Sequence, residues 1–223
     1  MTPAEFVDEL EAANQELLDL LSGTAALEPD VEAGRELTVA ALLRVALRNE
    51  MEATDLAARW LATTPPEHVS VKLGLARQAG DEAKHYRLIE KRLAEMGDDL
   101  SGFDPLAGGY SPLFTYLDTL EGTVERMAAG PFTRESIAEV KNAQFISFCE
   151  AAGDHQTAAL YRDVIQPDEH FHHELGRTLL LDLATTPEEQ EAARAAARWT
   201  LDLAEELTSL ARERSGVHHA PGC

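Results

Sequence analysis

The sequence is poor in basic residues and in cysteine. Nineteen lysines and arginines stand against 40 aspartates and glutamates, which gives a formal net charge of −21. Nucleic acids and anionic membranes bind basic surfaces, so this balance argues against both as partners. The two cysteines are Cys149, which falls inside a helical pattern, and Cys223, the last residue. This usage does not indicate a disulfide framework.

Long apolar runs are also missing. No stretch approaches the roughly 18 uninterrupted apolar residues of a membrane span. The first ten residues, MTPAEFVDEL, are acidic and contain no basic region followed by an apolar one, so no signal peptide is predicted. Together these absences predict a cytoplasmic protein. The 223 residues are enough for one large domain with a substantial core.

Strand signals are nearly absent, whereas helix signals are frequent. There is no sustained apolar alternation and no Asn-Gly or Asp-Gly turn. Thr2, Thr64 and Thr186 are each followed by proline and, three residues on, by glutamate, which is the spacing of a capping box. Ser111 and Thr133 are also expected to begin helices. Three glycines are placed to end helices: Gly23, Gly97 and Gly153.

We therefore predict an all-α protein. The predicted helices lie near residues 3–21, 35–62, 66–96, 112–129, 134–152, 155–183 and 187–213. The order is hairpin, long connection, hairpin, which is the connectivity of a ferritin-like four-helix bundle with one long crossover. Here the crossover consists of a Gly/Pro/Asp-rich loop and a helix of its own, which Gly130-Pro131 is expected to end.

The predicted domain covers residues 1–214. Its first and last helices are extra to the bundle and are expected to pack on the outside. Residues 215–223 have no periodic pattern and are predicted to form a disordered tail.

A pentad of the form Asp-Glu-x-x-His occurs twice, at residues 81–85 and 168–172. Residues i and i+3 share a helix face, so each pentad directs one carboxylate and one imidazole the same way. At 100° per residue, both pairs and Glu50 fall within apolar stripes. A buried carboxylate is costly unless it is paired or bound to a metal. These stripes therefore indicate a site inside the bundle.

The helix near 134–152 offers two candidates for a further carboxylate. Glu135 continues the apolar seam of that helix, whereas Glu139 lies about 40° toward its polar side. Counting heights from the turn at Gly153 instead favours Glu139, which is nearly level with Glu169. We favour Glu135 because of the helix face on which it lies, and Glu139 is a close second.

Four carboxylates and two imidazoles facing inward are typical of a dinuclear iron or manganese site. Zinc sites more often have fewer carboxylates and tetrahedral closure. Asp81 and Asp168 are placed to accept a hydrogen bond from the ligand histidine of the partner helix. The predicted metal ligands are Glu50, Glu82, His85, Glu135, Glu169 and His172.

The paired motifs resemble those of the ferritin-like di-iron carboxylate superfamily. They are most similar to its oxygen-activating branch, which includes multicomponent monooxygenase hydroxylases, ribonucleotide reductase small subunits and acyl-carrier desaturases. The match covers both pentads and Glu50, over roughly residues 35–183. In the monooxygenase branch the remaining glutamate lies well upstream of a Gly-Asp turn, as Glu135 does relative to Gly153-Asp154, and this supports Glu135.

The resemblance implies an oxidoreductase that uses two iron ions, or manganese, to activate dioxygen. The implied reaction is hydroxylation, desaturation or N-oxygenation of a small organic substrate, and the metal ligands are the only catalytic residues assigned. An electron-donor protein is expected because the sequence has no flavin or nicotinamide fingerprint. The sequence leaves open whether the protein forms a homodimer. The alternative is an iron-handling ferritin-like protein with ferroxidase or peroxide-scavenging activity, for which the acidic surface would attract Fe²⁺.

Several neighbours of the motifs have plainer interpretations. His170 and His173 are expected outside the ligand set, although His173 becomes a ligand if the register slips. For Tyr161 we favour a role in the core over a redox role. Gln78 and Arg162 are expected to border the site.

Overall fold

A computed structural model of the chain describes residues 1–23, 38–215 and 221–222. This part of the chain contains helices and no strand, so the all-α prediction is confirmed. The α-helices are α1 (Pro3–Gly23), α2 (Val39–Thr63), α3 (Val69–Glu95), α4 (Pro112–Asp118), α5 (Thr123–Met127), α6 (Glu135–Ala151), α7 (His155–Leu160), α8 (Gln166–Leu183) and α9 (Pro187–Ser215). Two π-helical segments connect neighbouring helices: η2 (Ala128–Arg134) lies between α5 and α6, and η3 (Tyr161–Ile165) lies between α7 and α8.

Two of the three predicted capping boxes are present. The backbone N–H of Glu5 donates to the Thr2 hydroxyl, and that of Glu189 donates to Thr186, while each glutamate accepts a bond in return. The prediction at Thr64 is wrong. Thr64 caps the end of α2, and α3 begins five residues later at Val69, where the residue before it, His68, makes no side-chain cap. The second proline, Pro66, therefore extends the connection instead of opening the helix.

The predicted helix near 112–129 is divided, and its predicted end is wrong. Residues 119–122 separate α4 from α5, and the chain then passes through Gly130-Pro131 without leaving helical geometry, because η2 accommodates both. Thr133, expected as an N-cap, is fully buried inside η2 and accepts a hydrogen bond from Asn14. A π-helix leaves room for a proline because its hydrogen bonds run from i to i+5.

The approach of η2 to α8 depends on a glycine. A Cβ atom added to Gly176 of α8 would lie 2.4 Å from the backbone nitrogen of Phe132 and 2.7 Å from the carbonyl carbon of Pro131. Backbone atoms cannot move aside as a flexible side chain can, so a larger residue would push η2 away from α8. Gly176 therefore fixes the position of η2, and with it the start of α6.

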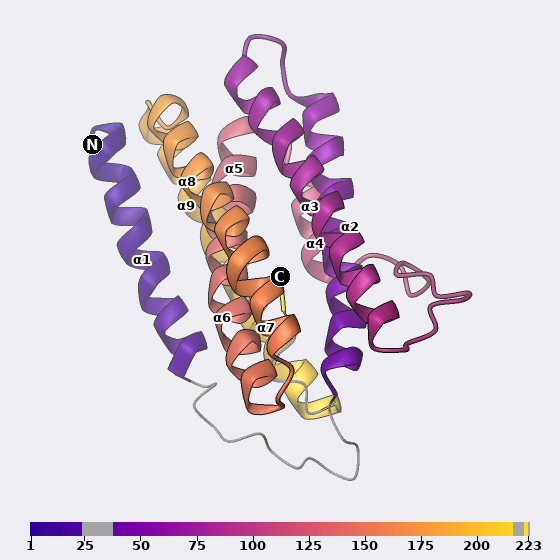
Figure 1. The fold of residues 1–223 in the computed structure, drawn as a ribbon. Coiled ribbons are helices and arrows are strands. Elements are labelled where there is room, and N and C mark those ends of the chain that lie inside the picture. Colours follow the sequence, from indigo (N-terminus) through magenta and orange to yellow (C-terminus); the bar gives the residue numbers. More distant parts are fainter. Residues whose placement is uncertain (24–37, 216–220, 223) are drawn as a thin grey trace.

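The helices form a bundle in which α2 and α3 make one hairpin and α6 with α7–α8 makes another (Figure 1). Helix α1 packs against α6, α8 and α9, and α9 packs against α5 and η2. The core has two main apolar clusters. One surrounds Trp60, Phe132 and Leu179, and the other surrounds Leu43, Phe145 and Tyr161. Within the described residues, no helix combines the length and the apolar character needed to cross a bilayer.

Pro221 and Gly222, from the predicted tail, are buried against the bundle. The other residues beyond Ser215 lie outside the described part of the chain, as do residues 35–37 of the predicted second helix.

Candidate metal centre

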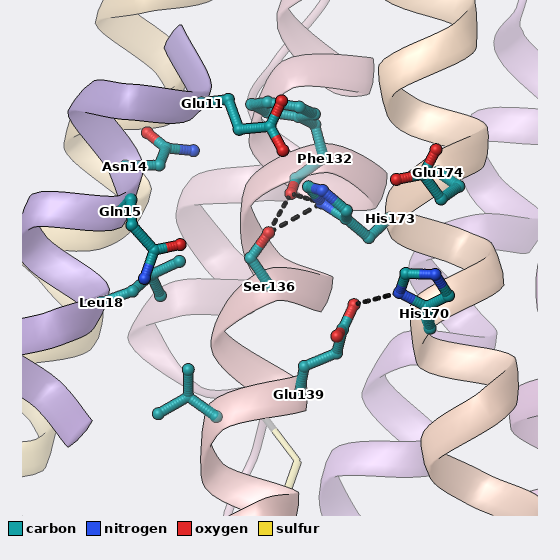
Figure 2. Close-up of a pocket in the computed structure, with 11 residues that line it drawn as sticks. Glu11, Asn14, Gln15, Leu18, Phe132, Ser136, Glu139, His170, His173 and Glu174 are labelled. Carbon is teal, nitrogen blue, oxygen red and sulfur yellow. Dashed lines mark hydrogen bonds and ion pairs between the residues drawn. The ribbon is translucent and has the colours of Figure 1, made fainter. Parts of the chain in front are cut away.

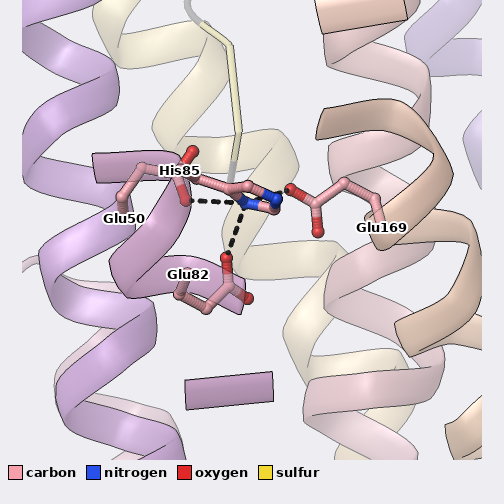
Figure 3. Close-up of side chains that lie close together, drawn as sticks. All are labelled: Glu50, Glu82, His85 and Glu169. Carbon is pink, nitrogen blue, oxygen red and sulfur yellow. Dashed lines mark ion pairs between the residues drawn. The ribbon is translucent and has the colours of Figure 1, made fainter. Parts of the chain in front are cut away.

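The six predicted ligands converge between the two helical hairpins. They form two overlapping groups, in each of which the ligand atoms all lie within 4.8 Å of one another. Figure 3 shows the first group, in which the carboxylates surround the imidazole of His85. Two carboxylates, Glu82 and Glu169, belong to both groups. The groups are Glu50, Glu82, His85 and Glu169, and Glu82, Glu135, Glu169 and His172.

All six side chains are buried, with exposures of 0–4 %. Apolar residues on the same helix faces lie on both sides of them: Leu75 and Ile89 flank the α3 pair, and Ile165 and Leu179 flank the α8 pair. The cluster therefore occupies a polar layer between the two apolar clusters. Carboxylates in such surroundings need a cation or protons, since isolated charges are costly to bury.

The two imidazoles are oriented by crossed hydrogen bonds. His85 Nε2 of α3 lies 2.9 Å from Asp168 Oδ2 of α8, and His172 Nε2 of α8 lies 3.3 Å from Asp81 Oδ2 of α3. A carboxylate accepts, so in each ring Nε2 donates, and Nδ1 faces the cluster. This is the predicted arrangement, and it is the one that metal-bound histidines usually have.

Among the described residues, the Nδ1 atom of His85 has no hydrogen-bond partner, although it is fully buried. It lies 3.4 Å from Glu50, 3.3 Å from Glu82 and 3.7 Å from Glu169, so three carboxylates surround it. Buried polar atoms are nearly always satisfied, so an orphan of this kind calls for an explanation. A metal ion shared by the nitrogen and the three carboxylates provides one, and the donor set of oxygen and imidazole nitrogen fits iron or manganese.

Lys84 closes the layer on the side of the two aspartates. Its ammonium lies 2.5 Å from Asp168 and 3.3 Å from Asp81, so one cation bridges both acceptors of the crossed hydrogen bonds. Arg77 adds a contact of 3.3 Å to Asp81. Burial would raise the pKa of Asp168, but its bonds to Lys84 and His85 lower it, so it is the charged form of Asp168 that holds the imidazole.

Glu135 has two polar partners besides the cluster. Gln78 Nε2 donates to its carboxylate at 2.6 Å, and Arg134 donates at 2.8 Å. Gln78 was expected at the site, but Arg134 was missed. The expected helix end at Gly130-Pro131 made Arg134 the first residue of a new helix, whereas the chain continues through η2, where the Arg134 side chain is 8 % exposed. The signal that could have identified Arg134 is its place in the sequence, directly before a predicted ligand, Glu135.

Protons take the place of cations in the metal-free site. Burial raises the pKa of Glu50 to about 7, and burial with the charge of Glu82 raises that of Glu169 well above its usual range. Burial alone would lower the pKa of both histidines, but the carboxylates outweigh it and raise the pKa of His85 to about 12 and of His172 to about 9. Burial would also raise the pKa of Glu82, but the neighbouring His85 ring and the nearby positive charges of His172 and Arg134 lower it.

Glu139 does not join the cluster, so the structure favours Glu135 over it. The comparison of heights from the turn at Gly153 assumed regular helices and was misleading. The helix face was the better guide, because Ala138, Asn142 and Phe145 continue the seam of Glu135 and are buried. Glu139 instead lines a cavity of about 240 Å³ between α1, α6 and α8 (Figure 2). The exposed ring of His170 lies 3.5 Å from its carboxylate.

The same cavity holds His173. Its Nδ1 lies 2.7 Å from the Phe132 carbonyl oxygen and 2.7 Å from the Ser136 hydroxyl, and its ring stacks on Phe132. A carbonyl oxygen only accepts, so Nδ1 is the donor there. His173 is thus tied to η2 and is not a ligand of the buried cluster.

The predictions for Tyr161 and Arg162 have different outcomes. Tyr161 is fully buried in the core beside Phe145, its hydroxyl has no partner within the described part of the chain, and burial raises its pKa well above 10. Arg162 does not border the site: it is exposed and pairs with Glu150, so that prediction is wrong.

We compared the chain with protein-family models, with curated proteins and with solved structures, and none of them matches it. The assignment of a function therefore depends on the geometry of the site.

Proposed function

We propose that the protein is a non-haem di-iron or di-manganese oxidoreductase with a ferritin-like four-helix bundle, which uses dioxygen to oxidise a small organic substrate. The two groups of ligands would each hold one metal ion, with Glu82 and Glu169 shared between them. Bound iron would supply the electrons and open coordination positions that dioxygen activation needs. Electrons for further turnovers would come from a donor protein.

One observation carries this proposal: the crossed pairing of the two pentads. Each aspartate orients the imidazole of the opposite helix, and each imidazole turns Nδ1 toward the shared carboxylates. A core with a purely structural role would not need four buried carboxylates. It would also not leave His85 Nδ1 without a hydrogen-bond partner among the described residues. Both features are expected when a cation belongs in the site.

The chain's own residues have three tasks in this mechanism. Glu82 and Glu169 would help to hold both ions, and the aspartates keep the imidazoles in the tautomer whose Nδ1 would be free to coordinate. The apolar clusters on either side exclude water from the reacting atoms. Gln78 and Arg134 hold Glu135, which sets the position of that carboxylate relative to the second group.

A second function, iron handling by a ferroxidase, is supported by the cavity between α1, α6 and α8. Its lining includes Glu11, Glu139, Glu174, His170 and His173, which suit a hydrated cation better than an apolar substrate. This cavity uses the outer faces of the same two helices, α6 and α8, that supply Glu135, Glu169 and His172.

Loading with iron separates these functions. Purified protein is incubated with Fe²⁺ without oxygen, bound iron is counted, and oxygen is then admitted with and without an external reductant. We expect two irons per chain and oxygen consumption that continues only with reductant. A ferroxidase would instead oxidise many Fe²⁺ per chain without one. If no iron binds before or after oxygen is admitted, and no manganese binds in a parallel incubation with Mn²⁺, both functions are excluded.

A further inference from the structure

The peptide group between Pro221 and Gly222 is held by two asparagines. Asn49 Nδ2 of α2 donates to the Pro221 carbonyl oxygen at 2.9 Å, and the Gly222 N–H donates to Asn142 Oδ1 of α6 at 2.9 Å. Both residues of this dipeptide are buried. Figure 1 shows this end of the chain at mid-height of the bundle and not beyond the end of α9.

The two asparagines match a peptide group in both of its polar atoms. One presents a donor to the carbonyl oxygen, and the other presents an acceptor to the N–H. Proline suits the first position because it has no N–H of its own to satisfy. Gly222 has φ +72°, and a Cβ atom added to it would lie 3.4 Å from Asn49 Cβ. Glycine is the residue that adopts this conformation without strain.

Asn142 has a second polar atom that the dipeptide does not use. Its side chain is fully buried, and its Nδ2 has no partner among the described residues. An unsatisfied buried donor costs about 1–3 kcal/mol, so an asparagine here is disfavoured unless a ligand uses it. The same amide therefore offers one further hydrogen bond to a carbonyl or carboxylate oxygen beside the dipeptide.

The position of the two asparagines links them to the cluster. Asn49 directly precedes Glu50 on α2, and Asn142 lies on the same buried face of α6 as Glu135, two turns away. A ligand held between them lies along the seam where the two hairpins face each other. We propose that Asn49 and Asn142 form a binding site for a Pro-Gly peptide group next to the carboxylate–histidine cluster, and that Pro221–Gly222 occupies it as an internal ligand.

Amide hydrogen exchange in the full, metal-free chain tests the contact. We expect the Gly222 N–H to exchange at least tenfold more slowly than in an unstructured peptide, and this protection to be lost in Asn142→Ala and in Asn49→Ala. Asn49 is only half-buried, so its variant stays informative if Asn142→Ala does not fold.

The matched control is Asn14→Ala, which removes another buried asparagine, one that donates to Thr133 far along the sequence. It should leave Gly222 protected. Fast exchange of Gly222 in the unaltered chain, or an equal loss in Asn14→Ala, would overturn the proposal.

Binding of a probe in trans tests whether the site recognises peptides. Gly222→Val should expel the dipeptide, because the branched side chain of valine is strained at this positive φ. We expect this full-length variant to bind acetyl-Ala-Pro-Gly-amide at least tenfold more tightly than the unaltered chain in calorimetry. Acetyl-Ala-Pro-Ala-amide should bind more weakly, and adding Asn142→Ala should abolish binding. If Gly222→Val does not bind the first tripeptide, or if Asn142→Ala does not weaken binding, no such site exists. Neither measurement involves metal, so the outcome is independent of the proposed oxidoreductase.

Discussion

The protein has two collections of glutamate and histidine, to both of which helices α6 and α8 contribute, and they differ in what surrounds them. The cluster between the inner faces of α6 and α8 and the α2–α3 hairpin is buried, and each of its imidazoles is oriented by an aspartate of the opposite hairpin. The cavity on their outer faces holds His170, which is mostly exposed, and His173, which is tied to a backbone carbonyl. Residue type is the same in both regions, but only the inner one gathers ligand atoms within 4.8 Å. Burial and orientation therefore mark the stronger candidate for a metal centre.

Removing a shared carboxylate should have the largest effect on this contrast. In Glu169→Ala both groups of ligands lose a member, so we expect binding of both metal ions to be abolished, with helical content largely unchanged because the apolar seams remain. Iron per chain and far-ultraviolet circular dichroism measure the two quantities. His170→Ala, one residue along on the outer face, is the control and should still bind two irons. Loss of the whole fold in Glu169→Ala would show that this residue is mainly structural.

The two candidate glutamates of α6 provide the next test. Glu135→Ala removes a ligand of the second group only, so we expect one of the two irons to be lost or bound at least 100-fold more weakly, with a changed iron–oxo absorption. Glu139→Ala should leave stoichiometry and absorption as they are. A spectrum altered by the Glu139 substitution and unaltered by the Glu135 substitution would reverse the assignment of the fourth carboxylate.

The sequence predicted the inner cluster because its signal is periodic. Glu50, Glu82 and Glu169 interrupt apolar stripes that recur at helical spacing, and a carboxylate in such a position needs a partner whatever the details of the fold. The Asp-to-His contacts followed from the same spacing, because residues one position before each glutamate face the neighbouring helix.

The sequence did not predict features that depend on tertiary packing. Gly130 and Pro131 usually end helices, but here the chain continues as η2, whose close contact with Gly176 of α8 no local pattern records. Arg134 was missed for the same reason. The cavity on the outer face likewise requires α1 to lie against α6 and α8, and the sequence indicates only that α1 is an extra helix.

Weakening the orientation of an imidazole should have a smaller effect than removing a ligand. Asp168→Asn keeps the size of the side chain but loses the charge that holds His85 Nε2 and Lys84. We expect metal affinity to fall about 10–100-fold, the range found for such supporting residues. Competition with a chelator measures it. Asp163→Asn, an exposed aspartate one turn earlier in η3, is a matched control and should not change the affinity.

The pH dependence should also distinguish the two regions. A group whose pKa is raised in the folded protein stabilises the fold below its ordinary pKa, and this contribution is lost as the pH rises through the folded value. For Glu50 the loss runs from about 4.5 to about 7, and for His172 from about 6.5 to about 9. We expect the Tm of the metal-free protein to fall over pH 5–9.

Metal binding displaces the same protons, so affinity should rise over this range and the loaded protein should keep its Tm better. Glu50→Gln should flatten the lower half of the metal-free profile. Burial also raises the pKa of Glu139, but Glu139→Gln should change the profile less, because this side chain is 27 % exposed and that of Glu50 only 5 %. A metal-free Tm that stays level from pH 5 to pH 9 would contradict the assigned protonation of the cluster.

The smallest effect concerns the ion pair of the outer cavity. His170 is 64 % exposed and lies 3.5 Å from Glu139, so water screens the pair and its coupling energy should be about 0–1 kcal/mol. The His85–Asp168 pair is 2.9 Å apart with a fully buried imidazole, and its coupling should be larger, because removing one partner leaves the other poorly solvated. Double-mutant cycles by urea unfolding of the metal-free protein, at pH 6 for both pairs, compare them directly. Equal couplings would mean that burial does not separate the two regions, and the distinction between a metal centre and a solvated pocket would then have to come from metal binding alone.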